Sequence, residues 1–316
     1  MHSTGIAADP RVRQHHPGPG HPERPDRYTA VMNQLESSGL LLDLTRLEAR
    51  AATNDDLAVV HTREYISLVE REVAAGHRQL STGDTDLSAS SLKSARIAAG
   101  SVLSAVDAVF AQHVRNAFCV VRPPGHHASA AIGMGFCLFN NVAIGTRYAQ
   151  QRYGAERVLI ADWDVHHGNG IQNIFYRDAS VLFFSTHQSP WYPGTGGTSE
   201  RGEGPGAGKT INCPFPAGSG RREIVGAFEN ILLPAAREFH PDCIFISAGF
   251  DSRVNDPLGQ FLLADADFAE LTRMMTVLAA EHCNSRLISV LEGGYNLQGL
   301  ANAAETHVRA LQQSES

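Results

Sequence analysis

The segment ADWDVHHGNG, residues 161–170, places two carboxylates and two adjacent histidines directly after the apolar run RVLI. If the segment continues as a strand, Asp162, Asp164 and His166 project to the same side. Carboxylate oxygens and imidazole nitrogens together suit zinc or a similar divalent ion. Two ligands from this segment and a third from elsewhere in the chain, for which Asp251 is the natural choice, would leave one coordination position open for water. The alternative is a buried cluster whose members satisfy one another through hydrogen bonds and ion pairs.

A second pair of histidines, His126 and His127, lies in the segment RPPGHHA. The preceding Pro-Pro-Gly restricts the backbone, and a histidine pair beside a metal can take up a proton and return it. The unperturbed histidine pKa near 6.5 suits this work at neutral pH. A solvated or purely structural pair is the alternative.

The elements that must hold these residues are predicted from short apolar runs that alternate with longer segments of helical period. The predicted strands are 117–121, 157–161, 180–186, 210–215, 243–250 and 286–295. The predicted helices are 138–151, 221–239 and 265–283, and the N-terminal third is expected to be mainly helical. Strands that are apolar on both faces, with helices between them, indicate a mostly parallel sheet covered on both sides.

The polar clusters all follow predicted strands at their carboxyl ends. The histidine pair follows AFCVV, the 162–166 cluster follows RVLIA, Asp251 follows CIFISAGF and Tyr295 closes RLISVLEGG. In an open parallel sheet this edge is where ligand sites form, because the loops converge there on one crevice. The sequence therefore predicts one site that contains all four clusters.

Composition sets the remaining bounds. The chain has 316 residues, 43% of them hydrophobic, and a net charge of −7, which fits one large domain over 1–316 and no nucleic-acid partner. No apolar run approaches the roughly 18 residues of a membrane helix, and the first residues do not resemble a signal peptide, so we expect a cytoplasmic protein without a membrane partner. Five cysteines without a CxxC argue against disulfides and a thiolate zinc site. No feature indicates an oligomeric state.

Six motifs taken together resemble the zinc-dependent histone deacetylase family, closest to its class II and bacterial deacetylase-like members. They are RPPGHHA, GFCLFNNVAI, DWDVHHGNGIQNIF, STHQSPWYPGTG, ISAGFDS and LEGGYN, in this order from about residue 9 to the last helix. The resemblance implies the arginase/deacetylase-like three-layer α/β fold, with a central, mostly parallel sheet of about eight strands flanked by helices. It also implies hydrolysis of an N-acetyl amide on a lysine or similar amine.

The resemblance assigns the metal ligands residue by residue. Asp164, His166 and Asp251 correspond to the ligands of the catalytic zinc, in agreement with the spacing. Asp162 corresponds to a residue that supports His126 and that helps to hold a structural monovalent cation, expected to be potassium, near Ser185.

The same resemblance implies the proton-transfer groups. His127 corresponds to the general base and subsequent acid, with His126 as its electrostatic partner. Tyr295 is expected to donate its hydroxyl to the developing oxyanion, unless it only packs on the sheet. Asn169 stands where class I members carry an aspartate and class II members an asparagine, and a neutral partner stabilises the imidazolium of His127 less.

The substrate tunnel is implied by four further positions. Phe136 and Tyr192 match the two aromatics that line the acetyl-lysine tunnel, and Gly135 matches a glycine beside the substrate stem. Without the resemblance, Phe136 would be read as a core residue. Arg27 corresponds to an arginine of the inner channel that attracts acetate, although a surface ion pair is the alternative.

Two positions bear on substrate choice. Leu258, in NDPLGQ, stands where polyamine-specific relatives place a glutamate for a second cationic amine, which favours acetyl-lysine over acetylpolyamines. Asp84 or Asp86, in TGDTDLS, could contact a substrate backbone, but local turn chemistry is the preferred interpretation.

The sequence thus predicts a zinc-dependent deacetylase acting on acetylated, or other short-acyl, lysine side chains of proteins. The enzymatic alternative is an acetylpolyamine or other small acylamide hydrolase. A third possibility is a catalytically silent acyl-lysine binding module, against which the complete set of proton-transfer groups and ligands argues.

Overall fold

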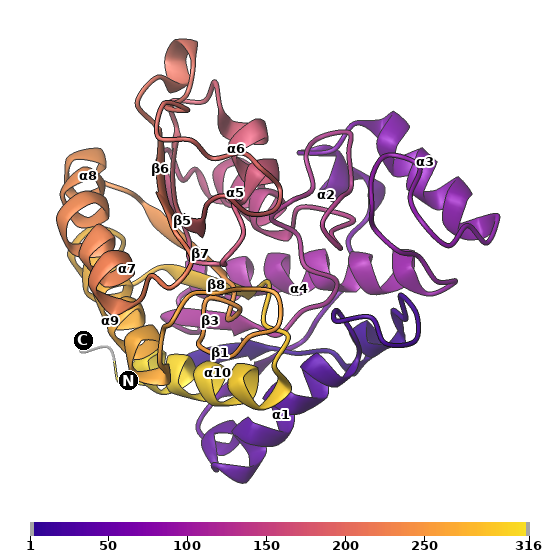
Figure 1. The fold of residues 1–316 in the computed structure, drawn as a ribbon, viewed down its shortest axis with the longest axis horizontal. Coiled ribbons are helices and arrows are strands. Elements are labelled where there is room, and N and C mark those ends of the chain that lie inside the picture. Colours follow the sequence, from indigo (N-terminus) through magenta and orange to yellow (C-terminus); the bar gives the residue numbers. More distant parts are fainter. Residues whose placement is uncertain (1–2, 314–316) are drawn as a thin grey trace.

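A central sheet of eight parallel strands organises the computed structural model, which describes residues 3–313 (Figure 1). The predicted domain of 1–316 therefore includes two N-terminal and three C-terminal residues that lie outside the described part. The strands follow one another in the order β2-β1-β3-β8-β7-β4-β5-β6. Their bounds are β1 Thr4–Ala7, β2 Thr45–Leu47, β3 Asn116–Cys119, β4 Val158–Asp162, β5 Val181–Gln188, β6 Thr210–Phe215, β7 Cys243–Ala248 and β8 Leu287–Leu291.

Helices cover both faces of this sheet and make it the middle of three layers (Figure 1). Helices α1, α8, α9 and α10 pack on one face, and α4, α5 and α6 pack on the other. The bounds are α1 Asp26–Ser37, α2 Asn54–Ala58, α3 Arg63–Ala74, α4 Ser91–Phe110, α5 Asn141–Tyr153, α6 Asn169–Phe175, α7 Arg221–Ala227, α8 Leu233–Phe239, α9 Asp265–His282 and α10 Leu297–Gln312. This is the arginase/deacetylase-like architecture that the motifs imply.

Strand β4 shows why a continuous apolar run predicts this sheet. Leu159 and Ala161 enter the core on the α9 and α10 side, whereas Val158 and Ile160 enter the core on the α4 and α5 side. All four side chains are fully buried, because a parallel strand between two helical layers has no face turned to water.

The structure differs from the prediction in the N-terminal third, where two strands, β1 and β2, accompany the helices. They form one margin of the sheet and have only four and three residues, too few to show a period. The predicted helix over 221–239 is also divided by a π-helical turn, Phe228–Leu232, before Pro234. A proline has no N–H for the helical ladder, which accounts for irregular hydrogen bonding next to it.

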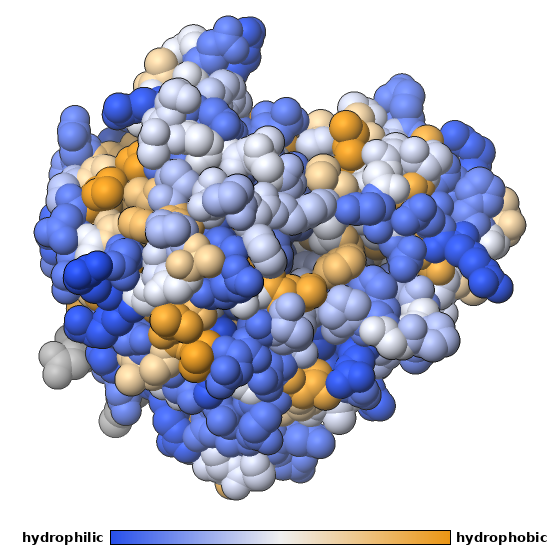
Figure 2. All heavy atoms as spheres, viewed as in Figure 1, coloured by the Kyte–Doolittle hydropathy of each residue, from blue (hydrophilic) through white to orange (hydrophobic). Residues whose placement is uncertain are grey.

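The surface seen in Figure 2 is mainly hydrophilic, with apolar side chains in small separate groups. Among the described helices, none combines the length and hydropathy that crossing a bilayer requires.

Candidate active site

The loops that follow β4 and β7 bring three predicted metal ligands together. Strand β4 ends at Asp162, so Asp164 and His166 lie in a loop rather than on the strand continuation assumed from the sequence. His166 Nδ1 lies 3.0 Å from Asp164 Oδ1 and 3.2 Å from Asp251 Oδ2. One ligand atom from each of the three residues lies within 4.8 Å of the others. Side chains still alternate between two sides in this loop, as they would along a strand: Asp164 and His166 lie at the candidate metal site, whereas Trp163 lies in the hydrophobic core.

This cluster has the properties of a cation site. The side chains of Asp164 and Asp251 are essentially inaccessible to solvent, and within residues 3–313 no donor makes a hydrogen bond of ordinary geometry to Oδ2 of Asp251. Burial and the neighbouring Asp164 raise the pKa of Asp251 to about 7. Burial opposes a charge on His166, yet the two aspartates outweigh it and raise its pKa to about 10. Two buried carboxylates thus demand a positive charge, and the oxygen and nitrogen donors fit zinc.

Two glycines leave room for the ligands. A Cβ atom on Gly249 would lie 2.1 Å from Asp164 Oδ2, and one on Gly293 would lie 2.0 Å from Asp251 Oδ2. The Gly293 amide also donates a hydrogen bond of 2.8 Å to Asp164 Oδ2. The backbone therefore reaches the ligands more closely than any residue with a side chain allows.

His126 is held as an imidazolium beneath the cluster. Its Nδ1 lies 3.1 Å from Asp162 Oδ2, and although burial disfavours the charge, Asp164 and Asp162 raise the pKa of His126 to about 10. The Glu292 carboxylate accepts hydrogen bonds from the backbone amides of Gly125 and His126 and so holds the loop that carries the histidine pair. The pairing of Asp162 with His126 agrees with the role that the resemblance implies.

His127 has the opposite character. Burial, together with the positive neighbours His126 and His166, lowers the pKa of His127 well below its usual value. Its Nδ1 lies 2.7 Å from Asn169 Oδ1, so this nitrogen donates and Nε2 keeps a lone pair. A neutral histidine with a free Nε2 can act as a base.

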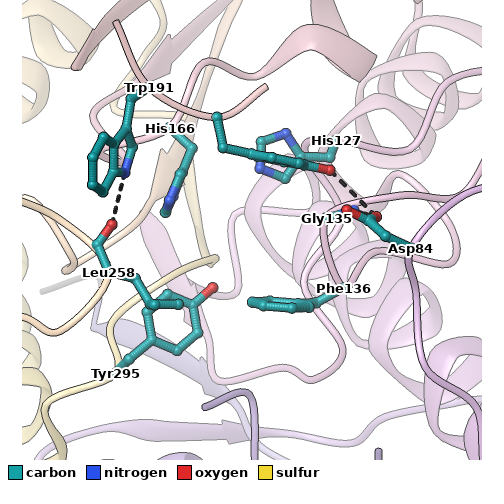
Figure 3. A pocket seen from close by; sticks show the side chains of 9 residues that line it. Asp84, His127, Gly135, Phe136, His166, Trp191, Leu258 and Tyr295 are labelled. Atoms are coloured by element: carbon teal, nitrogen blue, oxygen red, sulfur yellow. Dashed lines mark hydrogen bonds between the residues drawn. The ribbon is translucent and has the colours of Figure 1, made fainter. Parts of the chain in front are cut away.

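A cavity of about 250 Å³ opens above these groups (Figure 3). Figure 3 shows the phenol oxygen of Tyr295 pointing into the space between Phe136 and His166. The Arg27 guanidinium lies over the Tyr295 ring, 4.9 Å from its centroid. The cavity is lined by Asp84, His127, Gly135, Phe136, His166, Trp191, Tyr192, Leu258 and Tyr295.

The geometry bears on three positions for which the sequence offered two interpretations, and it changes the preferred one only at Asp84. Phe136 lines the cavity, as the resemblance implies, in a left-handed conformation with φ of 68°. Asp84 serves the cavity rather than a local turn, because its Oδ1 accepts hydrogen bonds from Gly135 N at 2.7 Å and from the Tyr192 hydroxyl at 3.3 Å. Arg27 is fully buried, so its ion pair with Glu23, at 3.2 Å, lies inside the protein rather than on the surface, and its Nε donates to the carbonyl of Gly294 at 2.6 Å.

Two further predicted residues, Ser185 and Leu258, also have defined neighbours. Ser185 is fully buried next to Asp162 in the register of β4 and β5, and its hydroxyl contacts His187 Nδ1 at 2.9 Å. Leu258 lies at the cavity wall, where its carbonyl accepts a hydrogen bond of 2.9 Å from the Trp191 indole.

The sequence interpretation did not assign roles to Trp191, Glu292, Gly249 or Gly293. All four stand inside quoted motifs, Trp191 in STHQSPWYPGTG, Gly249 in ISAGFDS, and Glu292 and Gly293 in LEGGYN, so their positions were visible but their partners were not. The contacts join residues that lie far apart in the chain, such as Glu292 and Gly125.

The fold and the cluster define an arginase/deacetylase-like α/β protein with a candidate metal centre, and comparisons agree. Residues 21–311 match the histone deacetylase domain. A probable deacetylase of Archaeoglobus fulgidus is 41% identical over 298 residues, covering 94% of this chain and 82% of that protein. The crystal structure of the HDA15 HD domain matches with a TM-score of 0.94 and 38% identity, over 98% of this chain and 88% of that one.

The human polyamine deacetylase HDAC10 is 42% identical over 300 residues, covering 92% of this chain. The matched region is 44% of that protein, so this chain spans less than half of its length. From the domain match and these identities, the chain belongs to the histone deacetylase family.

Proposed function

We propose that this protein is a zinc-dependent amidohydrolase that removes acetyl or other short acyl groups from lysine side chains. The observation that carries the proposal is the buried cluster of Asp164, His166 and Asp251 beneath a cavity that also exposes His127 and Tyr295. Zinc, when bound by these three residues, supplies a Lewis acid for the acyl oxygen and lowers the pKa of a water molecule.

The chain's own groups supply the proton transfers. His127 stays neutral and accepts the proton of the attacking water at Nε2, because Asn169 already occupies Nδ1. His127 then returns this proton to the leaving amine. Burial raises the pKa of Tyr295 well above its usual value, so the phenol keeps its hydrogen and can donate it to the developing oxyanion.

The walls of the cavity suit a lysine stem. The aromatic rings of Phe136 and Tyr192 line the cavity and give the lysine methylenes an apolar passage. The Tyr192 ring packs edge to face against His127, with the two ring centroids 5.2 Å apart. Leu258 gives the wall no counter-charge for a second ammonium group. We therefore rank acetyl-lysine above acetylpolyamines, although one relative is named a polyamine deacetylase.

Three finer expectations belong to the same proposal. The described cysteines are all buried free thiols, which suits a reducing compartment such as the cytoplasm. Asp162 and Ser185 are proposed to contribute to a structural potassium site. The whole chain, 1–316, is proposed to act as one catalytic domain without a nucleic-acid or membrane partner.

The test compares kcat/KM for acetyl-lysine peptides, acetylspermidine and longer acyl-lysines, using protein of measured zinc content. We expect zinc-dependent hydrolysis with acetyl-lysine peptides preferred. Higher kcat/KM for acetylspermidine would support the polyamine alternative, and tight binding of all substrates without turnover would support the silent module. Asp164→Ala, His166→Ala and Asp251→Ala should each lose activity and most zinc, because two remaining ligands hold the ion weakly.

A further inference from the structure

The amide of Asn169 has a different partner on each side. Its Oδ1 faces His127 Nδ1 at 2.7 Å, and its Nδ2 lies 3.4 Å from the sulfur of Met134. The oxygen and nitrogen of an amide are nearly equal in size, so the same space accepts the group rotated by 180°. The orientation that is held decides which atom His127 meets.

This orientation sets the tautomer of His127. Opposite Oδ1 of Asn169, the neutral ring carries its hydrogen on Nδ1 and has a lone pair on Nε2. If the amide were reversed, its Nδ2 would donate to Nδ1, and the ring hydrogen would sit on Nε2. A ring in that form cannot accept a proton from water at Nε2.

The sulfur of Met134 distinguishes the two orientations. A thioether accepts a weak hydrogen bond and donates none, so it favours the NH2 group and disfavours the amide oxygen. Among the described residues, Nδ2 of Asn169 has no hydrogen-bond partner other than this sulfur. The preference of the sulfur is therefore the clearest local difference between the two amide orientations.

The turn that carries Met134 is itself held in place. The Met134 carbonyl accepts a hydrogen bond of 3.0 Å from the Cys137 amide, and the preceding Gly133 amide donates to Thr82 Oγ1 at 3.2 Å. The following residue, Gly135, passes so close to His127 that an added Cβ would lie 2.2 Å from its ring. One rigid turn thus supports the His127 ring and presents the sulfur to Asn169.

We propose that Met134 is a positioning residue whose sulfur fixes the amide of Asn169 and thereby the tautomer of His127 that accepts the proton. This inference rests on the proposed function, in which His127 is the base. It adds a residue whose influence reaches the reacting atoms only through Asn169.

Two substitutions of similar size separate acceptor chemistry from packing. Met134→Leu removes the acceptor and keeps an apolar side chain, whereas Met134→Gln restores an acceptor oxygen on a chain of similar length. We expect Met134→Leu to lower kcat by about threefold to tenfold with KM nearly unchanged, and Met134→Gln to recover most of the loss.

The same substitution in an Asn169→Asp background is the matched control. A carboxylate presents an oxygen to His127 Nδ1 in either orientation, so it has no reversed state. We therefore expect Met134→Leu to lower kcat in the parent but not in the Asn169→Asp protein. A loss of equal size in both backgrounds would mean that Met134 only supports packing, and would overturn the proposal.

A spectroscopic measurement reads the tautomer without relying on turnover. In zinc-loaded protein labelled with 15N-histidine, the His127 signals, identified by their loss in His127→Gln, should show hydrogen on Nδ1. Met134→Leu should add the Nε2–H form, and a single Nδ1–H form with unchanged kcat would refute the inference. If the tautomers shift as expected but no zinc-loaded variant hydrolyses any acyl-lysine, the positioning role stands and the proposed function fails.

Discussion

Substituting Gly293 by alanine is a direct test of the buried ligand cluster. The φ of Gly293 lies outside the left-handed range, so the change is a matter of space alone. The new Cβ would lie 2.0 Å from Asp251 Oδ2 and 2.5 Å from Asp164 Oδ2, whereas Cβ atoms essentially never approach within 3.0 Å of another heavy atom. The carboxylates must retreat by about 1 Å, and metal sites tolerate ligand displacements of about 0.2 Å.

We expect zinc affinity to fall by about 100-fold or more, and deacetylation to fall with it. Overpacking should cost the metal-free protein only about 1 to 3 kcal/mol of unfolding free energy, so it stays folded. The assays are zinc binding against a competing chelator, deacetylation of an acetyl-lysine peptide, and denaturant unfolding.

The matched control is Gly226→Ala, a glycine in α7 whose added Cβ meets nothing closer than an Asn230 side-chain atom at 3.9 Å. It should keep zinc affinity and activity and gain up to about 1 kcal/mol of stability, because alanine favours a helix. If Gly293→Ala binds zinc as tightly as Gly226→Ala, the cluster does not hold the metal.

Three further predictions follow from the site and the core. Tyr295→Phe should lower kcat about 100-fold with little change in substrate Kd, and unchanged turnover would exclude the phenol as oxyanion donor. Leu258→Glu should shift the ratio of kcat/KM values towards acetylspermidine by about 5-fold to 150-fold, less at high salt; no shift would place amine selectivity in other loops. Burial lowers the pKa of His307 to about 3, so only the unfolded chain binds its proton between pH 6.5 and 3, and stability is lost as the pH falls through this window. His307→Gln should therefore reduce the pH slope of unfolding free energy between pH 4 and 6 by about 1.4 kcal/mol per pH unit relative to the parent protein; equal slopes in the two proteins would refute a neutral His307.

Much of the fold follows from local pattern. The strand predicted at 157–161 and found at 158–162 was predictable because its residues between the two helical layers are buried, and the apolar run 158–161 reflects this directly. Strand β2, by contrast, has three residues of which two are exposed, so no pattern marks it. Its place comes from parallel pairing with β1, which sequence periodicity does not encode.

The candidate site divides in the same way. Asp164, His166 and Asp251 were predictable because residue type and strand-end position together indicate a ligand set. The hydrogen bond from Asn169 to Met134 was not predictable, since it depends on which way the Asn169 side-chain amide is oriented in the folded protein. The buried Arg122 pairs with Glu23, 99 positions away, and such a contact is fixed only once the chain is folded.

The most direct test of the central claim is a zinc titration of chelator-treated protein, with acetate release from an acetyl-lysine peptide followed at each step. We predict that hydrolysis is negligible without metal and rises linearly to a plateau at one zinc per chain. In Asp251→Ala, the same additions should restore little activity, because one of the three ligands is missing. Full hydrolysis by metal-free protein, or a parent protein that binds one zinc tightly and releases no acetate, would contradict the account.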